Sequence, residues 1–217
     1  MSIARLNIRT SALTILAAAV LAACGGGGDS DNNSGSTHSS TPTPAATSVP
    51  LVTSVATPTY VASSPEKIIF DKVNAERMKC GFGAIQQNTL LDTAAKNHAL
   101  YNLAHKVFGH DETTGKTGFT GIDAVARANS VGYFSKSWIS EGISYPHFFS
   151  PVATNVLNQL SSPYHSQTML AEYTDIGIGY SNMVEGEVGA TVFNYGSGNL
   201  EIGQLPSSSV GVRTYPC

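Results

Sequence analysis

The stretch YTDIGIGY, residues 173–180, decides the fold of this chain. Its apolar side chains alternate with small or polar ones, and this period of two is typical of a β-strand. The same period appears in ATVFNY, residues 190–195, after a turn that contains Glu185-Gly186-Glu187. The two stretches therefore predict an antiparallel hairpin. A further strand is predicted at Trp138-Ile139, just before Glu141, which gives a small and mainly antiparallel sheet.

Helical patterns precede the hairpin and predict helices packed on the faces of this sheet. Ser64-Pro65-Glu66 combines an N-cap, a proline at the first helical position and an acidic first turn, and Gly81 would end that helix. A second helix is predicted from Asn88 to about Gly109. Shorter helices are predicted from Asp123 to Ala128, from Ser150-Pro151 through Leu160, and from Pro163 to Leu170.

The first 24 residues have the features of an export signal. Arg5 and Arg9 precede an apolar run at residues 12–23, which is shorter than the roughly 20 residues of a membrane-spanning helix. The run ends in Leu21-Ala22-Ala23-Cys24, which resembles the bacterial lipoprotein box, so we expect lipid on Cys24 and a chain anchored to a membrane of the cell envelope. An ordinary secretory signal and an uncleaved anchor are the alternatives.

Residues 25–64 are rich in Gly, Ser, Thr, Asn, Asp and Pro, and they contain few large apolar side chains. Such a segment cannot bury enough surface to offset its conformational entropy, so we predict a disordered tether. The globular domain is then expected at residues 65–205, followed by a tail at residues 206–217.

Composition excludes several functional classes. The chain has 217 residues and a formal net charge of -3, and its Lys and Arg residues form no stripe, so we expect no nucleic-acid partner. It contains no Gly-x-Ser-x-Gly elbow, phosphate-binding glycine loop or His-Glu-x-x-His helix. Three cysteines are present, and because Cys24 would carry lipid, export would leave Cys80 and Cys217 to form a disulfide.

A series of short motifs resembles the CAP domain (cysteine-rich secretory protein, antigen 5, pathogenesis-related) from Phe70 to about Tyr195. The motifs occur in the order expected for this family: Val73-Asn74-Ala75-Glu76-Arg77 with Cys80-Gly81, Leu91-Asp92-Thr93-Ala94-Ala95 with His98-Ala99, His110-Asp111-Glu112 with Gly118-Phe119-Thr120-Gly121, Arg127 with Gly132-Tyr133, Glu141, Ser162-Pro163-Tyr164-His165 with Met169-Leu170, and the start of the stretch quoted first. The resemblance implies an α-β-α sandwich, in which helices cover both faces of a short sheet.

The resemblance also implies a cleft built from His110, Glu112, Glu141 and His165. Neutral imidazoles are good ligands for zinc and similar divalent ions, and carboxylates can orient a ring or move a proton. His110 and His165 are therefore the candidate metal ligands. The alternative is that these side chains only cap helices and bridge loops. His98 lies mid-helix among alanines and is expected to be a hydrogen-bonded packing residue.

This chain departs from the family pattern at two places beside the candidate site. Ser140-Glu141-Gly142-Ile143 stands where the family usually has Gly-Glu-Asn-Ile, and Ser166 stands where an Arg often follows the second histidine. The acid, Glu141, and the base, His165, are kept. The neighbouring groups expected to support them are replaced.

Three functions are compatible with these residues. The first is a binding module of the cell envelope that holds a divalent ion, or a lipid, sterol, peptide or other small amphipathic ligand. The second is a metal-assisted hydrolase of peptide or ester bonds, with Glu112 or Glu141 as general base. The third is a structural spacer in the envelope.

Overall fold

The computed structural model describes residues 51–145, 150–182, 189–200 and 215–217. All of them belong to one compact unit, Ala46–Cys217. Cys24, the first part of the predicted tether, the predicted turn at residues 185–187 and most of the predicted tail lie outside the described residues. None of the described helices is both long enough and apolar enough to cross a bilayer.

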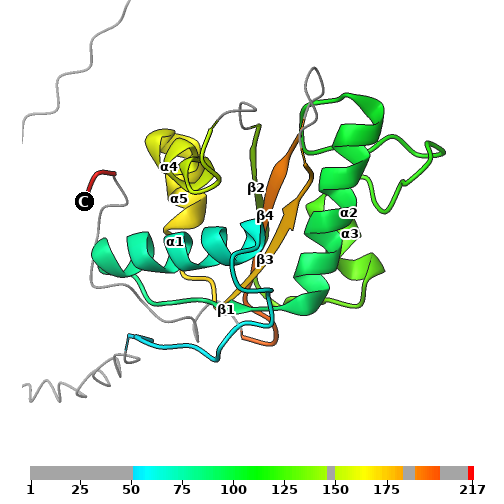
Figure 1. The fold of residues 1–217 in the computed structure, drawn as a ribbon. Coiled ribbons are helices and arrows are strands. Elements are labelled where there is room, and N and C mark those ends of the chain that lie inside the picture. The colour runs from blue at the N-terminus through cyan, green and yellow to red at the C-terminus, as the bar shows by residue number, and fades with distance from the viewer. Residues whose placement is uncertain (1–50, 146–149, 183–188, 201–214) are drawn as a thin grey trace, which may run out of the picture. The chain divides into compact units, whose positions relative to one another are not determined.

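Helices and short strands are interspersed along the described chain (Figure 1). In chain order they are α1 (Pro65–Lys79), β1 (Gln86–Gln87), α2 (Thr89–His105), α3 (Ala124–Ser130), β2 (Ile139–Ser144), α4 (Thr154–Ser161), α5 (Pro163–Met169), β3 (Asp175–Tyr180) and β4 (Thr191–Gly196).

The strands form one sheet in the order β1-β3-β4-β2. β3 pairs antiparallel with β4, and β4 pairs antiparallel with β2, so the predicted hairpin and the mainly antiparallel sheet are confirmed. β1 pairs parallel with β3 through Gln86 and Gln87, and it was missed because two residues are too few to show a period.

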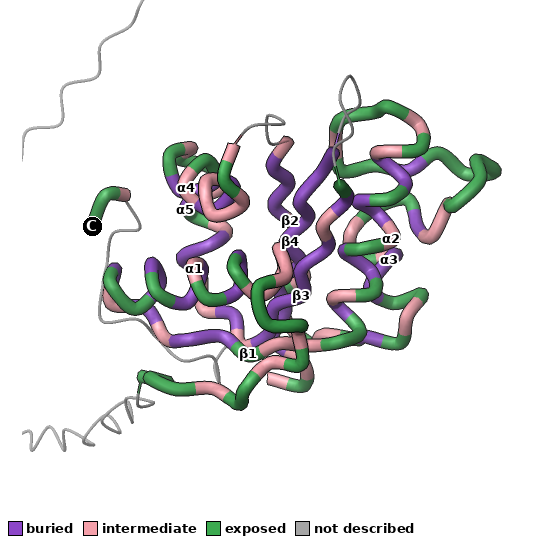
Figure 2. The backbone as a smooth tube through the Cα atoms, viewed as in Figure 1, coloured by how far each residue is buried: buried purple, intermediate pink, exposed green. Residues whose placement is uncertain are grey.

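Helices cover both faces of the sheet, which confirms the α-β-α sandwich (Figure 1). On one face, α1, α4 and α5 pack on Ile176 and Ile178 of β3 and on Phe193 and Tyr195 of β4. On the other face, α2 lies against β3 and β4, and α3 lies against β2. The buried residues follow the two inner strands and the helix sides that meet them (Figure 2).

The glycines of β3 let α2 approach the sheet closely. An added Cβ would lie 2.1 Å from the carbonyl carbon of Leu91 at Gly177, and 2.2 Å from that of Ala95 at Gly179. Alanines on the inner side of α2, including Ala95 and Ala99, complete this tight contact. The Ile-Gly-Ile-Gly alternation therefore serves both layers, because the isoleucines fill one core and the glycines make room for a backbone on the other side.

The predicted starts of α1 and α2 agree with the structure, whereas that of α4 does not. Ser64 accepts a hydrogen bond from the Lys67 amide, and Asn88 accepts from the amides of Leu90 and Leu91. The predicted start at Ser150-Pro151 is wrong, since α4 begins at Thr154. Residues 151–156 form a tight turn with bonds between residues three apart, so a proline here precedes the α-helix by a full turn.

The prediction that residues 25–64 form a disordered tether is wrong for residues 51–64, which we call the strap. The Val52 carbonyl accepts from the Ala84 amide at 2.8 Å, and the Thr59 amide donates to Gln87 at 2.6 Å. The Tyr60 hydroxyl donates to Asp92 on α2. The strap is ordered because its scattered apolar residues are supported by hydrogen bonds to the domain, which composition does not reveal.

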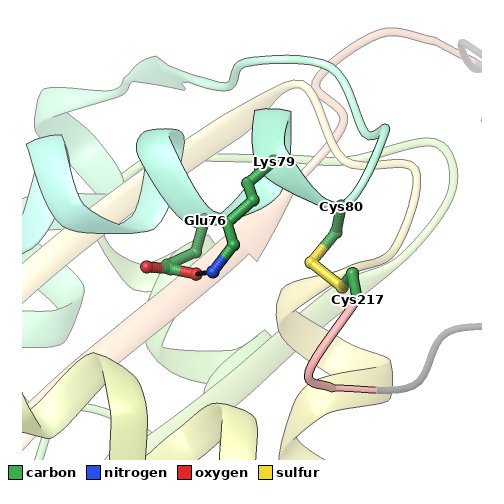
Figure 3. The surroundings of a disulfide bond; sticks show 4 residues. All are labelled: Glu76, Lys79, Cys80 and Cys217. Atoms are coloured by element: carbon green, nitrogen blue, oxygen red, sulfur yellow. Dashed lines mark ion pairs between the residues drawn. A yellow bond between two sulfur atoms is a disulfide. The ribbon is translucent and has the colours of Figure 1, made fainter.

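Cys80 and Cys217 form the predicted disulfide, with their Cα atoms 5.1 Å apart (Figure 3). Cys80 is the C-cap of α1, so the bond joins the last residue of the chain to the end of the first helix. Beside it, Lys79 approaches Glu76 at 3.7 Å on the same helix. The ring of Tyr215 packs against the core next to this bond.

Candidate functional site

His110 lies in the loop after α2, and its side chain is 53% exposed. Its Nδ1 lies 2.9 Å from Oε1 of Glu141 on β2. A carboxylate can only accept, so Nδ1 carries the hydrogen and Nε2 is left as the ring atom that Glu141 does not engage. The preceding residue, Gly109, has a positive φ of 135°, and its amide donates to the Tyr145 hydroxyl, which positions the loop.

The side chain of Glu141 is only 2% exposed, and polar contacts hold it in place. Nη2 of Arg127, on α3, donates to both carboxylate oxygens at 2.8 Å. Asn194 lies opposite Glu141 in the β2 and β4 pairing, and its amide nitrogen donates to Oε2 at 3.0 Å in the orientation that satisfies both of its polar atoms. The hydrogen bond to Glu141 raises the pKa of His110 above its ordinary value, outweighing the opposing effect of burial.

Glu112 turns into the domain and contacts His98. Its Oε1 lies 2.9 Å from Nδ1 of His98, and its Oε2 accepts from the Thr120 amide at 2.6 Å and the Gly121 amide at 3.3 Å. Both Glu112 and His98 are buried. The Glu112 carboxylate therefore fastens the loop after α2 to the helix itself.

His98 connects the two carboxylates. Its Nε2 lies 3.0 Å from the Gly109 carbonyl and 3.8 Å from Oε1 of Glu141, while Nδ1 faces Glu112. His98 is hydrogen-bonded and buried, as expected for a packing residue, and it also lies at the centre of the polar cluster behind His110. The polar cluster, as we define it, contains His98, Glu112, Arg127 and Glu141.

His165 is the third residue of α5 and is half-buried. Burial lowers its pKa, and the positive charge of His110 lowers it further, so the two imidazoles interact electrostatically. The next residue, Ser166, is buried and donates to the Pro163 carbonyl at 3.1 Å, inside the helix rather than towards a ligand. Within the described ranges, no three His, Cys, Asp or Glu side chains converge to hold a metal ion.

Arg127 is the residue of the site that sequence reasoning missed. In the sequence it stands out only as part of a motif, yet it is fully buried and is the ionic partner of Glu141. Glu141 lies 14 residues further along the chain, on a different element, so no helical spacing could reveal the pair. A charged side chain in a short, alanine-rich helix was the available signal, because such a residue is buried only with a partner.

A sequence profile of the Cysteine-rich secretory protein family, CAP, matches residues 70–195 of this chain. The chain belongs to the CAP family. The match spans α1 to β4 and includes His110, Arg127, Glu141 and His165, so the polar cluster belongs to the CAP domain itself. No curated protein was found to match this chain.

Solved structures agree with the CAP fold. An outer surface protein from Borrelia burgdorferi superposes with a TM-score of 0.52 at 17% identity, covering 64% of this chain and 97% of that protein. An extracellular protein with an SCP domain from Bacillus anthracis superposes with a TM-score of 0.50 at 19% identity, covering 61% of this chain and 40% of that protein. At such identities the comparison shows the shared fold alone.

Proposed function

We propose that this CAP domain is a binding module of the cell envelope that holds a divalent cation, such as zinc, through His110 and His165. The observation that carries the proposal is the contact of His110 Nδ1 with the buried carboxylate of Glu141. A carboxylate behind a histidine fixes its tautomer and increases the basicity of the other nitrogen, as in many metal sites. Nε2 of His110 is thereby prepared to bind a cation.

The donor set fits a weakly held ion. Two imidazoles are fewer than the three protein ligands usual at catalytic zinc sites, so the affinity should be modest. A bound cation would offer its remaining positions to oxygen or nitrogen atoms of a small amphipathic or peptide ligand. The exposed ring of Tyr164, beside His165, is 85% accessible and offers apolar surface for such a ligand.

The contacts of both glutamates favour binding over hydrolysis. A general base needs a free lone pair within reach of water, with a pKa suited to the working pH. Glu141 is engaged by Arg127 and His110, and Glu112 by His98 and two backbone amides. We therefore assign both carboxylates positioning roles and leave the metal-assisted hydrolase as the less supported alternative.

Zinc titration of the full-length chain by calorimetry tests the proposal. His110→Ala and His165→Ala should each abolish binding, while Glu141→Gln should weaken it by about 10-fold, the lower end of the effect of losing such a partner. His105→Ala is the matched control, because His105 instead contacts the Thr117 carbonyl. Unchanged zinc affinity in both His110→Ala and His165→Ala would show that the ion is bound elsewhere.

The same variants separate binding from catalysis. If the domain were a hydrolase, Glu141→Gln or Glu112→Gln would abolish peptide or ester cleavage in the presence of zinc and leave zinc bound. The binding function instead predicts that the wild-type chain has no such zinc-dependent cleavage to lose.

We further propose that lipid on Cys24 anchors the domain to a membrane of the bacterial cell envelope. The support is the Leu21-Ala22-Ala23-Cys24 sequence and the basic and apolar segments before it. Cys24→Ala should move the protein from the membrane fraction to the soluble fraction. Recovery of the wild-type chain in the soluble fraction with an unmodified N-terminus would exclude the anchor.

A further inference from the structure

Strand β2 forms one edge of the sheet, so one side of its backbone has no neighbouring strand among the described residues. The sheet order β1-β3-β4-β2 leaves β4 as the strand that pairs with β2. In an antiparallel pair, the N–H and C=O of one residue point to the same side of the strand, and successive residues alternate between the two sides. Every second residue of β2 therefore directs both backbone groups away from β4.

Hydrogen bonds elsewhere in the sheet identify these residues. On β3, the Ile178 amide donates to Asp92 of α2, so the backbone groups of Ile178 point away from β4. Phe193, which lies opposite Ile178 on β4, must then point to β2, where it faces Gly142. Gly142 is thus bonded to β4, and the preceding residue, Glu141, points its backbone N–H and C=O outward.

A bond from α4 agrees with this alternation. Nε2 of Gln159 donates to the Ile143 carbonyl at 2.6 Å, so this carbonyl is also directed away from β4. Ile139 and Glu141 precede Ile143 at two-residue spacing and direct their groups to the same side. The N–H and C=O of Ile139 and Glu141, four groups in all, have no hydrogen-bond partner in the described part of the chain.

Solvent reaches the backbone of Glu141. The residue as a whole is partly exposed, although its side chain is buried, so the exposed part is main chain. Farther along β2, Gly142, Ile143 and Ser144 are buried. The accessible part of the edge is therefore the first half of β2, at Ile139 and Glu141, which we call the open edge.

The open edge is flanked by the elements that carry the two candidate histidines. His110 contacts the Glu141 side chain on the face of the sheet that α2 and α3 cover. The helix that carries His165, α5, packs against β2 from the opposite face. Side chains of a strand alternate between the two faces of a sheet. A strand added at the open edge would therefore direct alternate side chains towards His110 and towards α5.

We propose that the open edge binds a peptide in an extended conformation, which adds to β2 as an antiparallel strand. Backbone groups of the peptide pair with the four unpartnered groups of Ile139 and Glu141, two at each residue. An extended backbone fits this row because its own N–H and C=O groups repeat at the same two-residue spacing. The proposal rests on the proposed binding function, whose ligand it names, but the pairing uses backbone groups alone and needs no cation.

A second copy of the domain fits the open edge less well than a single peptide. Edge-to-edge pairing of two domains would extend along the whole of β2, yet the second half of the strand is buried. The Ile143 carbonyl in that half is already bonded to Gln159. A single peptide needs only the open half.

Peptide titration of the full-length chain in the presence of EDTA tests the proposal. The probe is acetyl-Thr-Val-Thr-Val-Thr-amide, whose β-branched residues favour the extended conformation. Amide NMR should show saturable shifts at Ile139 and Glu141, with a dissociation constant of roughly 1 mM because no deep pocket contributes. Hydrogen exchange of these two amides should slow on binding, whereas the Gly142 amide should be protected already in the free chain.

N-methylated forms of the probe separate backbone pairing from side-chain contacts. An extended peptide has two edges, and N-methylation of both valines blocks only one of them. This analogue should bind within about threefold of the probe, since the threonine edge can still pair. N-methylation of all five residues should abolish binding, although every side chain is kept.

Ile139→Pro tests the open edge on the protein side. Proline removes the outward N–H, and it is tolerated on an edge strand where that N–H faces solvent. Ile139→Ala loses the same side chain but keeps the N–H. The proline variant should therefore bind the probe at least about tenfold more weakly than the alanine variant does. If Ile139→Pro does not fold, the N-methylated probes still test the pairing on the wild-type chain.

Four outcomes would overturn the proposal. They are unchanged Ile139 and Glu141 amides at about 10 mM probe, equal binding of the unmethylated and fully methylated peptides, equal binding by folded Ile139→Pro and Ile139→Ala variants, and protection of the two amides that rises with protein concentration in the absence of peptide. The last result would show pairing between two copies of the chain.

The use of EDTA keeps this test apart from that of the cation site. Zinc binding by a chain that does not bind the probe in EDTA would reject the peptide proposal alone. Probe binding by a chain that does not bind zinc would reject the cation site alone.

Discussion

The carboxylate of Glu141 contacts two residues, one buried and one exposed to solvent. Arg127 holds it from the buried side, and His110 contacts it from the exposed side. Removing a charge from water is expensive, so a carboxylate inside the domain needs an ionic partner, and Arg127 is that partner. Its contact with Nδ1 fixes the orientation of the His110 ring and the position of the ring hydrogen. The orientation and the tautomer of the exposed His110 ring therefore depend on the buried side chains of Glu141 and Arg127.

Replacing Glu141 should change the titration of His110. The hydrogen bond to Glu141 is the main cause of the raised pKa of His110, so Glu141→Gln should lower that pKa. Asp111→Asn is a matched control, because Asp111 is also an acid near His110 but contributes less to the shift. NMR titration of the His110 ring measures both variants. An equal effect of the two substitutions would contradict the role given to Glu141.

The same contact predicts how stability depends on pH. The pKa of His110 is raised in the folded chain, so the contact between imidazolium and carboxylate stabilises fully below the ordinary value near 6.5. That stabilisation is lost as the pH rises through the folded value above 6.5. The difference in unfolding free energy between wild type and His110→Gln should accordingly be largest in acid and shrink above neutrality. Urea unfolding at a series of pH values measures it, and a difference that grows with pH would contradict the pairing.

At the scale of elements, local patterns predicted helix starts where a side chain caps its own first turn. Ser64 and Asn88 bond to amides within three residues, which a linear sequence displays directly. The strap and β1 escaped prediction because their bonds go to distant segments, such as that between the Thr59 amide and Gln87. Separation along the chain hides these bonds from any local pattern.

Because α2 packs closely on β3, one methyl group added at this contact should strongly lower the stability of the fold. Gly179→Ala would place Cβ 2.2 Å from the backbone of Ala95, so the helix and strand must separate. We expect a loss of about 1–3 kcal/mol in unfolding free energy, as for other overpacked cores. Gly83→Ala is the control, since its nearest neighbour would be the Val52 carbonyl at 3.4 Å. Equal stability of the two variants in urea would argue against the tight packing of α2.

At the scale of the whole molecule, the disulfide links the end of the chain to its first helix. Cys80 and Cys217 are separated by 137 residues. A disulfide that closes a loop of this size is worth about 4–5 kcal/mol in the chain-entropy model. Cys217→Ser should lower the unfolding free energy by up to this amount, measured against the oxidised wild type. Labelling of two free thiols in the unreduced, exported protein would show that the bond does not form.

The sequence by itself determined the order of the helices and longer strands, the hairpin, the disulfide pairing and the CAP family. These features follow from side-chain periodicity, helix caps and short motifs. All three involve residues that are close together along the chain. It also pointed to His110, Glu141 and His165 as candidate site residues.

Only the tertiary structure decided what those residues touch. Arg127 meets Glu141, and Glu112 turns to His98, because helices and strands distant in sequence pack together. A buried charge is tolerated only beside a partner, and which partner is near depends on how the layers pack. The roles of individual side chains in this site therefore follow from packing rather than from spacing along the chain.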